Sequence, residues 1–140
     1  MTSFESRALL NRHKLRPTAG RLRILNLLVA SGSPLSAAEV HDKLGEERPD
    51  LATVYRSLDR FTAEAIVRPV RFEDGARRYE IAHGDHHHHL VCTSCGEIED
   101  LASCRIEPFA QAAFDRHGFR VASHSLEFYG TCRKCSQTQR

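Results

Sequence analysis

Residues 83–95 have the sequence HGDHHHHLVCTSC, and a second pair of cysteines lies near the C-terminus. Cys92 and Cys95 form one Cys-x-x-Cys pair, and Cys132 and Cys135 form the other. Two such pairs are typical of a tetrahedral zinc site with Zn–S distances of about 2.3 Å. Four protein ligands leave no open coordination position, so we expect this zinc to stabilise the fold and not to activate water.

Two disulfides are the alternative interpretation of the same cysteines. The chain begins without a recognisable signal peptide, and Cys104 is a fifth, odd cysteine. We therefore expect a cytoplasmic protein whose thiols stay reduced, and zinc in preference to disulfides. No apolar run approaches the roughly 18 residues that a membrane span needs. Cys104 receives no role, because a lone cysteine is usually an inert, small apolar residue.

The four consecutive histidines precede an apolar Leu-Val-Cys segment that is expected to be a strand. Successive side chains of an extended chain point to opposite faces, so His86 and His88 should face one way, and His87 and His89 the other. One run can then supply two separate metal sites. The alternative is a solvated polar loop that binds metal only adventitiously.

The distribution of charge differs between the two halves of the 140-residue chain. Residues 1–83 carry 14 Lys and Arg against 11 Asp and Glu, whereas residues 84–140 carry 6 against 7. A mild basic excess is compatible with phosphate contacts but is weak evidence by itself. The length allows two small domains, which we expect at residues 1–83 and 84–140.

The N-terminal half has the pattern of helices followed by a hairpin. Helices are predicted over residues 4–14, 19–30 with Thr18 as N-cap, 36–44 with a capping box, and 51–65. Strands over residues 66–72 and 77–82 flank an Asp-Gly turn. This order predicts a winged helix-turn-helix, in which the last helix enters the major groove of DNA and presents Thr53, Tyr55 and Arg56. The alternative is that these side chains only cover a solvated face.

The C-terminal half predicts a small α/β unit around the cysteine pairs. Strands are expected over residues 90–92, 96–101 and 123–129, and a helix over residues 107–117, ended by Gly118. So small a sheet with one helix cannot bury both of its faces. We therefore expect a homodimer, and an α+β protein in which a winged helix precedes a small α/β dimerisation domain.

Several segments together resemble the ferric uptake regulator (Fur) superfamily. They are Arg16-Pro-Thr-x-x-Arg21, Ala52-Thr-Val-Tyr-Arg-Ser-Leu58, Tyr79-Glu80, the segment from His86 to Gly96, and the segment from His124 to Cys132. Each is weak alone, but their combination spans nearly the whole chain. The resemblance implies a dimeric, metal-dependent transcription factor that acts as a repressor.

The resemblance also implies the roles of individual residues. It implies a regulatory metal site of Glu80, His87, His89 and Asp100. A second site is implied for His86, His88, Glu107 and His124. The expected DNA contacts come from Arg21, Thr53, Tyr55 and Arg56. Imidazole and carboxylate ligands suit Zn, Fe(II), Mn or Ni, so the regulatory metal stays open among Zn, Fe(II) and Mn.

The chain departs from the resemblance at three positions. Pro34 stands where many iron and peroxide sensors have a histidine, and Ala82 stands where zinc sensors often have a cysteine. Ala65 replaces the glycine that usually follows the recognition helix, so a left-handed conformation at this helix end is energetically less favourable. His13 and His41 could replace the missing ligand, although surface positions are the simpler interpretation.

The resulting prediction is a repressor of metal uptake or homeostasis genes that binds a palindromic operator in double-stranded DNA. Peroxide sensing through the bound metal is an alternative. A metal-dependent hydrolase, using two histidines and a carboxylate with an open position, is an alternative of another class. The last alternative is a zinc-binding interaction module that has no DNA partner.

Overall fold

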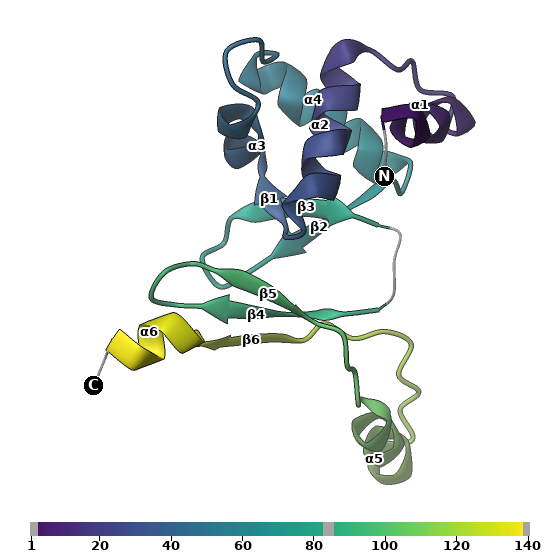
Figure 1. Ribbon diagram of the computed structural model, residues 1–140. Helices are drawn as coiled ribbons and strands as arrows, with labels where there is room; N and C mark the ends of the chain where they lie inside the picture. Colours follow the sequence, from purple (N-terminus) through teal and green to yellow (C-terminus); the bar gives the residue numbers. More distant parts are fainter. Residues whose placement is uncertain (1–2, 83–85, 139–140) are drawn as a thin grey trace. The chain divides into compact units, whose positions relative to one another are not determined.

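The computed structural model describes residues 3–82 and 86–138, and the chain divides into two compact units, Met1–Gly84 and Asp85–Arg140. The boundary that the sequence predicts, after residue 83, falls outside the described residues. Within the described ranges, none of the helices has the length and apolarity that crossing a bilayer requires. The helices and strands of each unit are labelled in Figure 1.

The first unit contains four helices, whose starts follow from short polar side chains. They are α1 (Ser3–Arg12), α2 (Ala19–Ser31), α3 (Ala37–Lys43) and α4 (Leu51–Ala63). Thr18 Oγ1 accepts a hydrogen bond from the backbone N–H of Arg21, as predicted for an N-cap. Ser36 and Glu39 form the predicted capping box. These bonds satisfy N–H groups that have no partner within the helix.

The core of the first unit is built from the apolar faces of these helices and the sheet beneath them. Val54, Leu58 and Phe61 of α4 are fully buried. They join a continuous apolar cluster with Leu9, Leu10, Leu15, Leu22, Ile24, Leu25, Leu28, Leu35, Ala37, Val40, Ile66, Val67 and Tyr79. Full burial of a large apolar side chain stabilises the fold by about 1.5–3 kcal/mol relative to exposure. The opposite face of α4 is thereby held rigidly towards solvent.

A three-stranded antiparallel sheet completes the first unit. It consists of β1 (Leu35–Ser36), β2 (Val67–Arg71) and β3 (Arg77–Ile81) in the order β1-β3-β2. At the hairpin turn Gly75 has φ +76°, and Asp74 accepts hydrogen bonds from the Arg78 guanidinium at 2.7 and 3.0 Å. Helices α2, α3 and α4 followed by this hairpin form the predicted winged helix-turn-helix.

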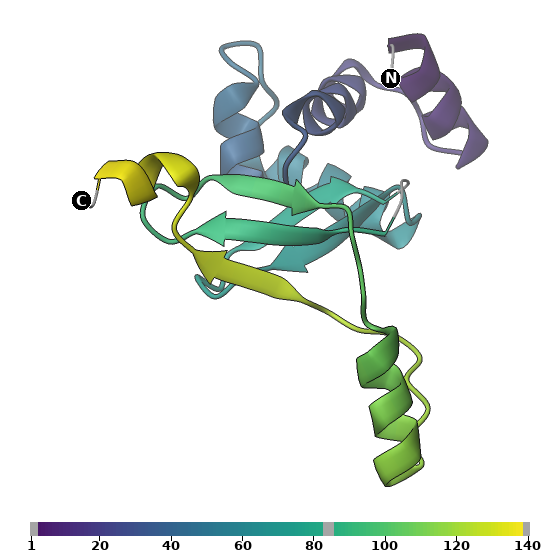
Figure 2. The same cartoon turned by 60° about the horizontal axis from the view of Figure 1, so that its bottom comes forward.

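The second unit is a small sheet with two helices. Its strands are β4 (His88–Cys92), β5 (Ile98–Leu101) and β6 (Glu127–Gly130), in the order β5-β4-β6. β4 pairs antiparallel with β5 and parallel with β6. The helix α5 (Glu107–His117) lies in the connection between β5 and β6. Figure 2 shows α5 extending away from the sheet, whereas α6 (Arg133–Thr138) follows β6 directly.

The structure differs from the sequence predictions at several element ends. The strand predicted over residues 123–129 is regular only over Glu127–Gly130, so His124 lies in an irregular segment. β1 and α6 were not predicted, because two residues and six residues are too short to show a period. The helix predicted over residues 51–65 ends at Ala63.

Ala65 follows α4 with φ +55°, the left-handed conformation that the sequence predicted for this stop. We expect Ala65→Gly to stabilise the protein by up to about 1 kcal/mol, because relief of the left-handed strain exceeds the added entropy of the unfolded chain. Ala63→Gly is the control, since Ala63 is exposed at the last helical position of α4, and should destabilise the protein by at most about 1 kcal/mol. The midpoint of urea unfolding, followed by circular dichroism of the helices, measures both changes in stability. A lower midpoint for Ala65→Gly than for wild type would contradict left-handed strain at Ala65.

Candidate metal centres

The four cysteines of the two Cys-x-x-Cys pairs converge beside the ends of β4 and β6. The Sγ atoms of Cys92, Cys95, Cys132 and Cys135 all lie within 4.8 Å of one another. The Sγ atoms of Cys95 and Cys132 are 3.8 Å apart. A tetrahedral zinc ion with Zn–S bonds of about 2.3 Å separates its sulfurs by about 3.8 Å. The cluster therefore fits a structural zinc ion.

Local backbone geometry prepares this cluster for metal. The backbone N–H of Cys132 donates to Cys92 Sγ at 3.3 Å, and this hydrogen bond is the largest of the effects that lower the pKa of Cys92 to about 6. Gly96, with φ +79°, closes the first knuckle, and its N–H donates to the Cys92 carbonyl. The neighbouring thiol of Cys132 raises the pKa of Cys135 to about 12. Crowded sulfurs of this kind ionise together only when a cation joins them.

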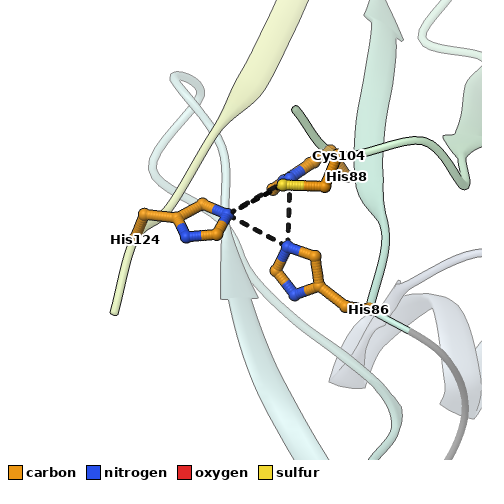
Figure 3. A group of neighbouring side chains, drawn as sticks. All are labelled: His86, His88, Cys104 and His124. Atoms are coloured by element: carbon orange, nitrogen blue, oxygen red, sulfur yellow. Dashed lines mark hydrogen bonds between the residues drawn. The ribbon is translucent and has the colours of Figure 1, made fainter. Parts of the chain in front are cut away.

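A second cluster contains three histidines, two at or just before the start of β4 and one from the segment before β6 (Figure 3). The Nε2 atom of His86 lies 3.2 Å from that of His88 and 3.0 Å from that of His124. Cys104 Sγ completes the group at 3.3 Å from His124 Nε2. Burial and the neighbouring imidazoles lower the pKa of His88, which favours the neutral, ligating form of its ring. In the described part of the chain Glu107 is not a member of this cluster.

The other two histidines of the run lie beside a carboxylate of the neighbouring strand. The rings of His87 and His89 are 5.0 Å apart, centroid to centroid. Asp100 faces His89 in the β4–β5 register, and its Oδ1 lies 3.8 Å from His89 Nε2 and 4.0 Å from His87 Nε2. Strand parity thus divides the run as the sequence predicted, with His86 and His88 in one group.

Glu80, the remaining residue of the predicted regulatory site, belongs to the first unit. It lies on β3 opposite Arg68 of β2, and the Arg68 Nε donates to Glu80 Oε1 at 2.7 Å. Any metal that binds Glu80 therefore shares this carboxylate with a guanidinium. The cation would have to offset part of an existing charge-assisted hydrogen bond.

The two histidines considered as substitutes at Pro34 have carboxylate neighbours of their own. His13 Nδ1 lies 3.6 Å from Glu64, and His41 Nδ1 lies 3.9 Å from Asp42. Both pairs are formed within the first unit. Neither histidine is part of a group of three ligating side chains among the described residues.

The helix α4 carries most of the residues predicted to contact DNA on its solvent-exposed side. Tyr55 and Arg56 are exposed, and the Arg56 Nη2 donates to Thr53 Oγ1 at 3.0 Å. Asp50 caps the start of the helix by accepting from the Thr53 N–H at 2.8 Å. Arg21 lies on α2, where its Nη1 donates to the Arg16 carbonyl at 3.0 Å. Burial of the opposite face of α4 positions Tyr55 and Arg56, and local hydrogen bonds also hold the guanidinium groups of Arg56 and Arg21.

Comparison with known proteins identifies the family. The sequence pattern of the ferric uptake regulator family matches residues 12–129. The chain is 36% identical over 138 residues to the ferric uptake regulation protein of Neisseria meningitidis, which covers 96% of each chain. The chain belongs to the ferric uptake regulator family.

Solved structures of Fur proteins agree with this assignment. The crystal structure of the Vibrio cholerae ferric uptake regulator is 36% identical, with a TM-score of 0.75, and covers 90% of this chain and 98% of that one. The Helicobacter pylori regulator, described as having three functional metal-binding sites, is 25% identical, with a TM-score of 0.78, and covers 97% and 95%. Fur proteins are metal-dependent, DNA-binding transcriptional regulators, so this chain is a regulator and not a hydrolase.

Sequence reasoning missed one member of the cluster of His86, His88 and His124, namely Cys104. Its only sequence signal was that it is the cysteine left over after two pairs are formed. It lies in an irregular segment between β5 and α5, where neither helical nor strand periodicity indicates which way a side chain points.

We expect Cys95→Ser to lose the structural zinc and with it the fold of the second unit, because the thiolates link segments that share little buried apolar surface. Ser94→Ala, between the same two cysteines, is the matched control and should keep both. Elemental analysis of zinc and near-ultraviolet circular dichroism measure the outcome. A folded Cys95→Ser protein with unchanged zinc would contradict the assignment.

Proposed function

We propose that this protein is a cytoplasmic, metal-dependent repressor of metal uptake or homeostasis genes that binds a palindromic operator as a homodimer. The observation that carries the proposal is the division of the histidine run between two ligand clusters, in a chain that also contains a winged helix. In a solvated histidine-rich loop, alternate side chains would not be divided between two ligand clusters. Membership of the Fur family supplies the regulatory context.

The exposed aromatic side chains of the second unit support a homodimer. Phe109 is 72% exposed, Phe119 63%, Phe128 45% and Phe114 43%. None of the described residues of α5 is buried, although the helix carries an apolar stripe. Large exposed apolar side chains gathered in one small unit mark an interaction surface. A second copy would cover this surface, and a two-fold dimer matches a palindromic DNA site.

We propose that α4 is the recognition helix. Tyr55 can contact base edges or methyl groups in the major groove, while Arg56 can pair with a phosphate. The Arg56 Nη2 donates a hydrogen bond to Thr53 Oγ1, and a guanidinium has five N–H donors in all, so Arg56 can also donate to an anion. Both side chains extend from a helix whose other face is fixed in the core.

We expect Arg56→Ala to weaken binding to all DNA sequences by a similar factor, because a phosphate contact carries no sequence information. The slope of log affinity against log salt should fall by roughly one unit. Arg116→Ala is the control, since it removes the same charge from an exposed position of α5. Fluorescence anisotropy at several salt concentrations measures both. An unchanged slope for Arg56→Ala would move the interface away from this helix.

The regulatory metal, in this proposal, is held by His87, His89 and Asp100, with Glu80 as the ligand predicted from the Fur resemblance. Zn, Fe(II) and Mn all suit imidazole and carboxylate ligands. Because Glu80 belongs to the first unit and the histidines to the second, a metal bound by all of them would restrict the motion of one unit relative to the other. Such a metal favours the DNA-binding arrangement only if it binds that arrangement more tightly than the others.

We expect His89→Ala to abolish the metal stimulation of DNA binding, which makes the variant at least about tenfold weaker than wild type at saturating metal. The fold and the structural zinc should persist, because the cysteine cluster does not include His89. His117→Ala, at the exposed end of α5, is the histidine control. DNA affinity is measured against metal concentration, and zinc content after dialysis.

The same experiment distinguishes the two histidine clusters. A normal metal response in His89→Ala, together with a lost response in His86→Ala, would make the His86, His88 and His124 cluster the sensor. The proposed assignment of the two faces would then be wrong.

A further inference from the structure

The cluster of His86, His88 and His124 has the geometry of a metal site whose fourth ligand is a sulfur. Its three Nε2 atoms are separated by 3.2, 3.0 and 3.4 Å. A tetrahedral ion with Zn–N bonds of about 2.0–2.1 Å separates two nitrogens by about 3.3 Å. It separates a nitrogen from a thiolate sulfur by about 3.6 Å. The Cys104 Sγ lies 3.3 Å from His124 Nε2, which is close to this nitrogen–sulfur separation (Figure 3).

Hydrogen bonds among the rings cannot account for this arrangement. A neutral imidazole nitrogen either donates one hydrogen bond or accepts one. Three Nε2 atoms in a closed triangle therefore cannot all be satisfied by one another, and protonation would place positive charges side by side. A cation at the common focus of the three lone pairs satisfies them together. The buried ring of His88 gains most from such a partner.

The position of Glu107 explains why sulfur, and not carboxylate, is the fourth donor. Glu107 is exposed at the first position of α5, whereas Cys104 is partly buried in the segment that leads from β5 to the helix. In this cluster, as far as the described residues show, the ligating atoms within 4.8 Å of one another are three imidazole nitrogens and the Cys104 sulfur.

We propose that Cys104, His86, His88 and His124 form a closed four-coordinate site for zinc. A thiolate selects borderline and soft ions, such as zinc and cobalt, over manganese and magnesium, which prefer oxygen. Four protein ligands leave no position for water, so the site holds its ion without activating a water molecule. It links the start of β4, the segment before α5 and the segment before β6, and so stabilises the region from which α5 extends. The ligand assignment concerns the second unit alone and does not depend on DNA binding.

Cobalt(II) is the probe, because a thiolate ligand adds a charge-transfer band in the near ultraviolet that nitrogen and oxygen ligands do not. Protein with zinc already in the four-cysteine cluster is titrated with cobalt, and retained zinc is measured so that displacement is recognised. We expect one cobalt–thiolate band in wild type. We expect none in Cys104→Ser, with cobalt affinity at the histidine cluster lowered at least about tenfold. Glu107→Gln is the matched control and should keep the band and the affinity.

Cys104→Asp tests the same proposal with a variant that can still supply a ligand. It should bind metal without the charge-transfer band and shift its preference from zinc towards manganese. Far-ultraviolet circular dichroism verifies that each variant is folded. The proposal is overturned if the band persists in Cys104→Ser while zinc is retained, or if cobalt-loaded wild type lacks the band. A lost DNA response with intact cobalt spectra would count against the proposed function and not against this site.

Discussion

The alternation of side chains in an extended backbone is the constraint on which the metal chemistry of this protein depends. Four adjacent histidines leading into β4 would compete for one ion if the segment were helical or irregular. Because the segment is extended, His86 and His88 join a cluster with His124, while His87 and His89 lie near Asp100 on β5. In the proposed assignment, this stretch of four residues separates an ion that stabilises the fold from an ion that regulates DNA binding.

The two units obtain their stability in different ways. The first unit has a continuous apolar core, and its cap and hairpin residues agree with the packing around them. Among residues 86–138, the buried side chains are those of Cys92, His88 and His89, which are metal-ligand types and not large apolar side chains. A small unit with so little apolar burial requires another source of free energy, and bound zinc and a second copy of the chain both supply it. In the proposed zinc-bound homodimer, folding, dimerisation and metal occupancy of this unit are consequently coupled.

The sequence was most informative where a local pattern alone determines geometry. The Ser36–Glu39 capping box and the Asp74-Gly75 turn each follow from a few adjacent residues, the left-handed stop at Ala65 was implied by the family resemblance, and the structure contains all three. Strand parity predicted the division of the histidine run for the same reason. The family resemblance then added Asp100, which lies in another strand and has no local signal.

The sequence was least informative where contacts depend on how an irregular segment folds back. Cys104 and His124 are twenty residues apart and lie outside regular elements, so no periodicity indicates that Cys104 Sγ and His124 Nε2 approach to 3.3 Å. The resemblance implied the carboxylate of Glu107 as the fourth donor. A resemblance matches positions in the sequence and does not describe the local path of the chain.

The most direct measurement is the anomalous diffraction of crystals grown with saturating zinc, recorded on both sides of the zinc absorption edge. The account predicts separate zinc peaks for the two histidine clusters, one at the focus of His86, His88 and His124 and one beside His87, His89 and Asp100, in addition to the peak within the four cysteines. A single peak shared by all four histidines of the run, or no peak at either cluster, would contradict it.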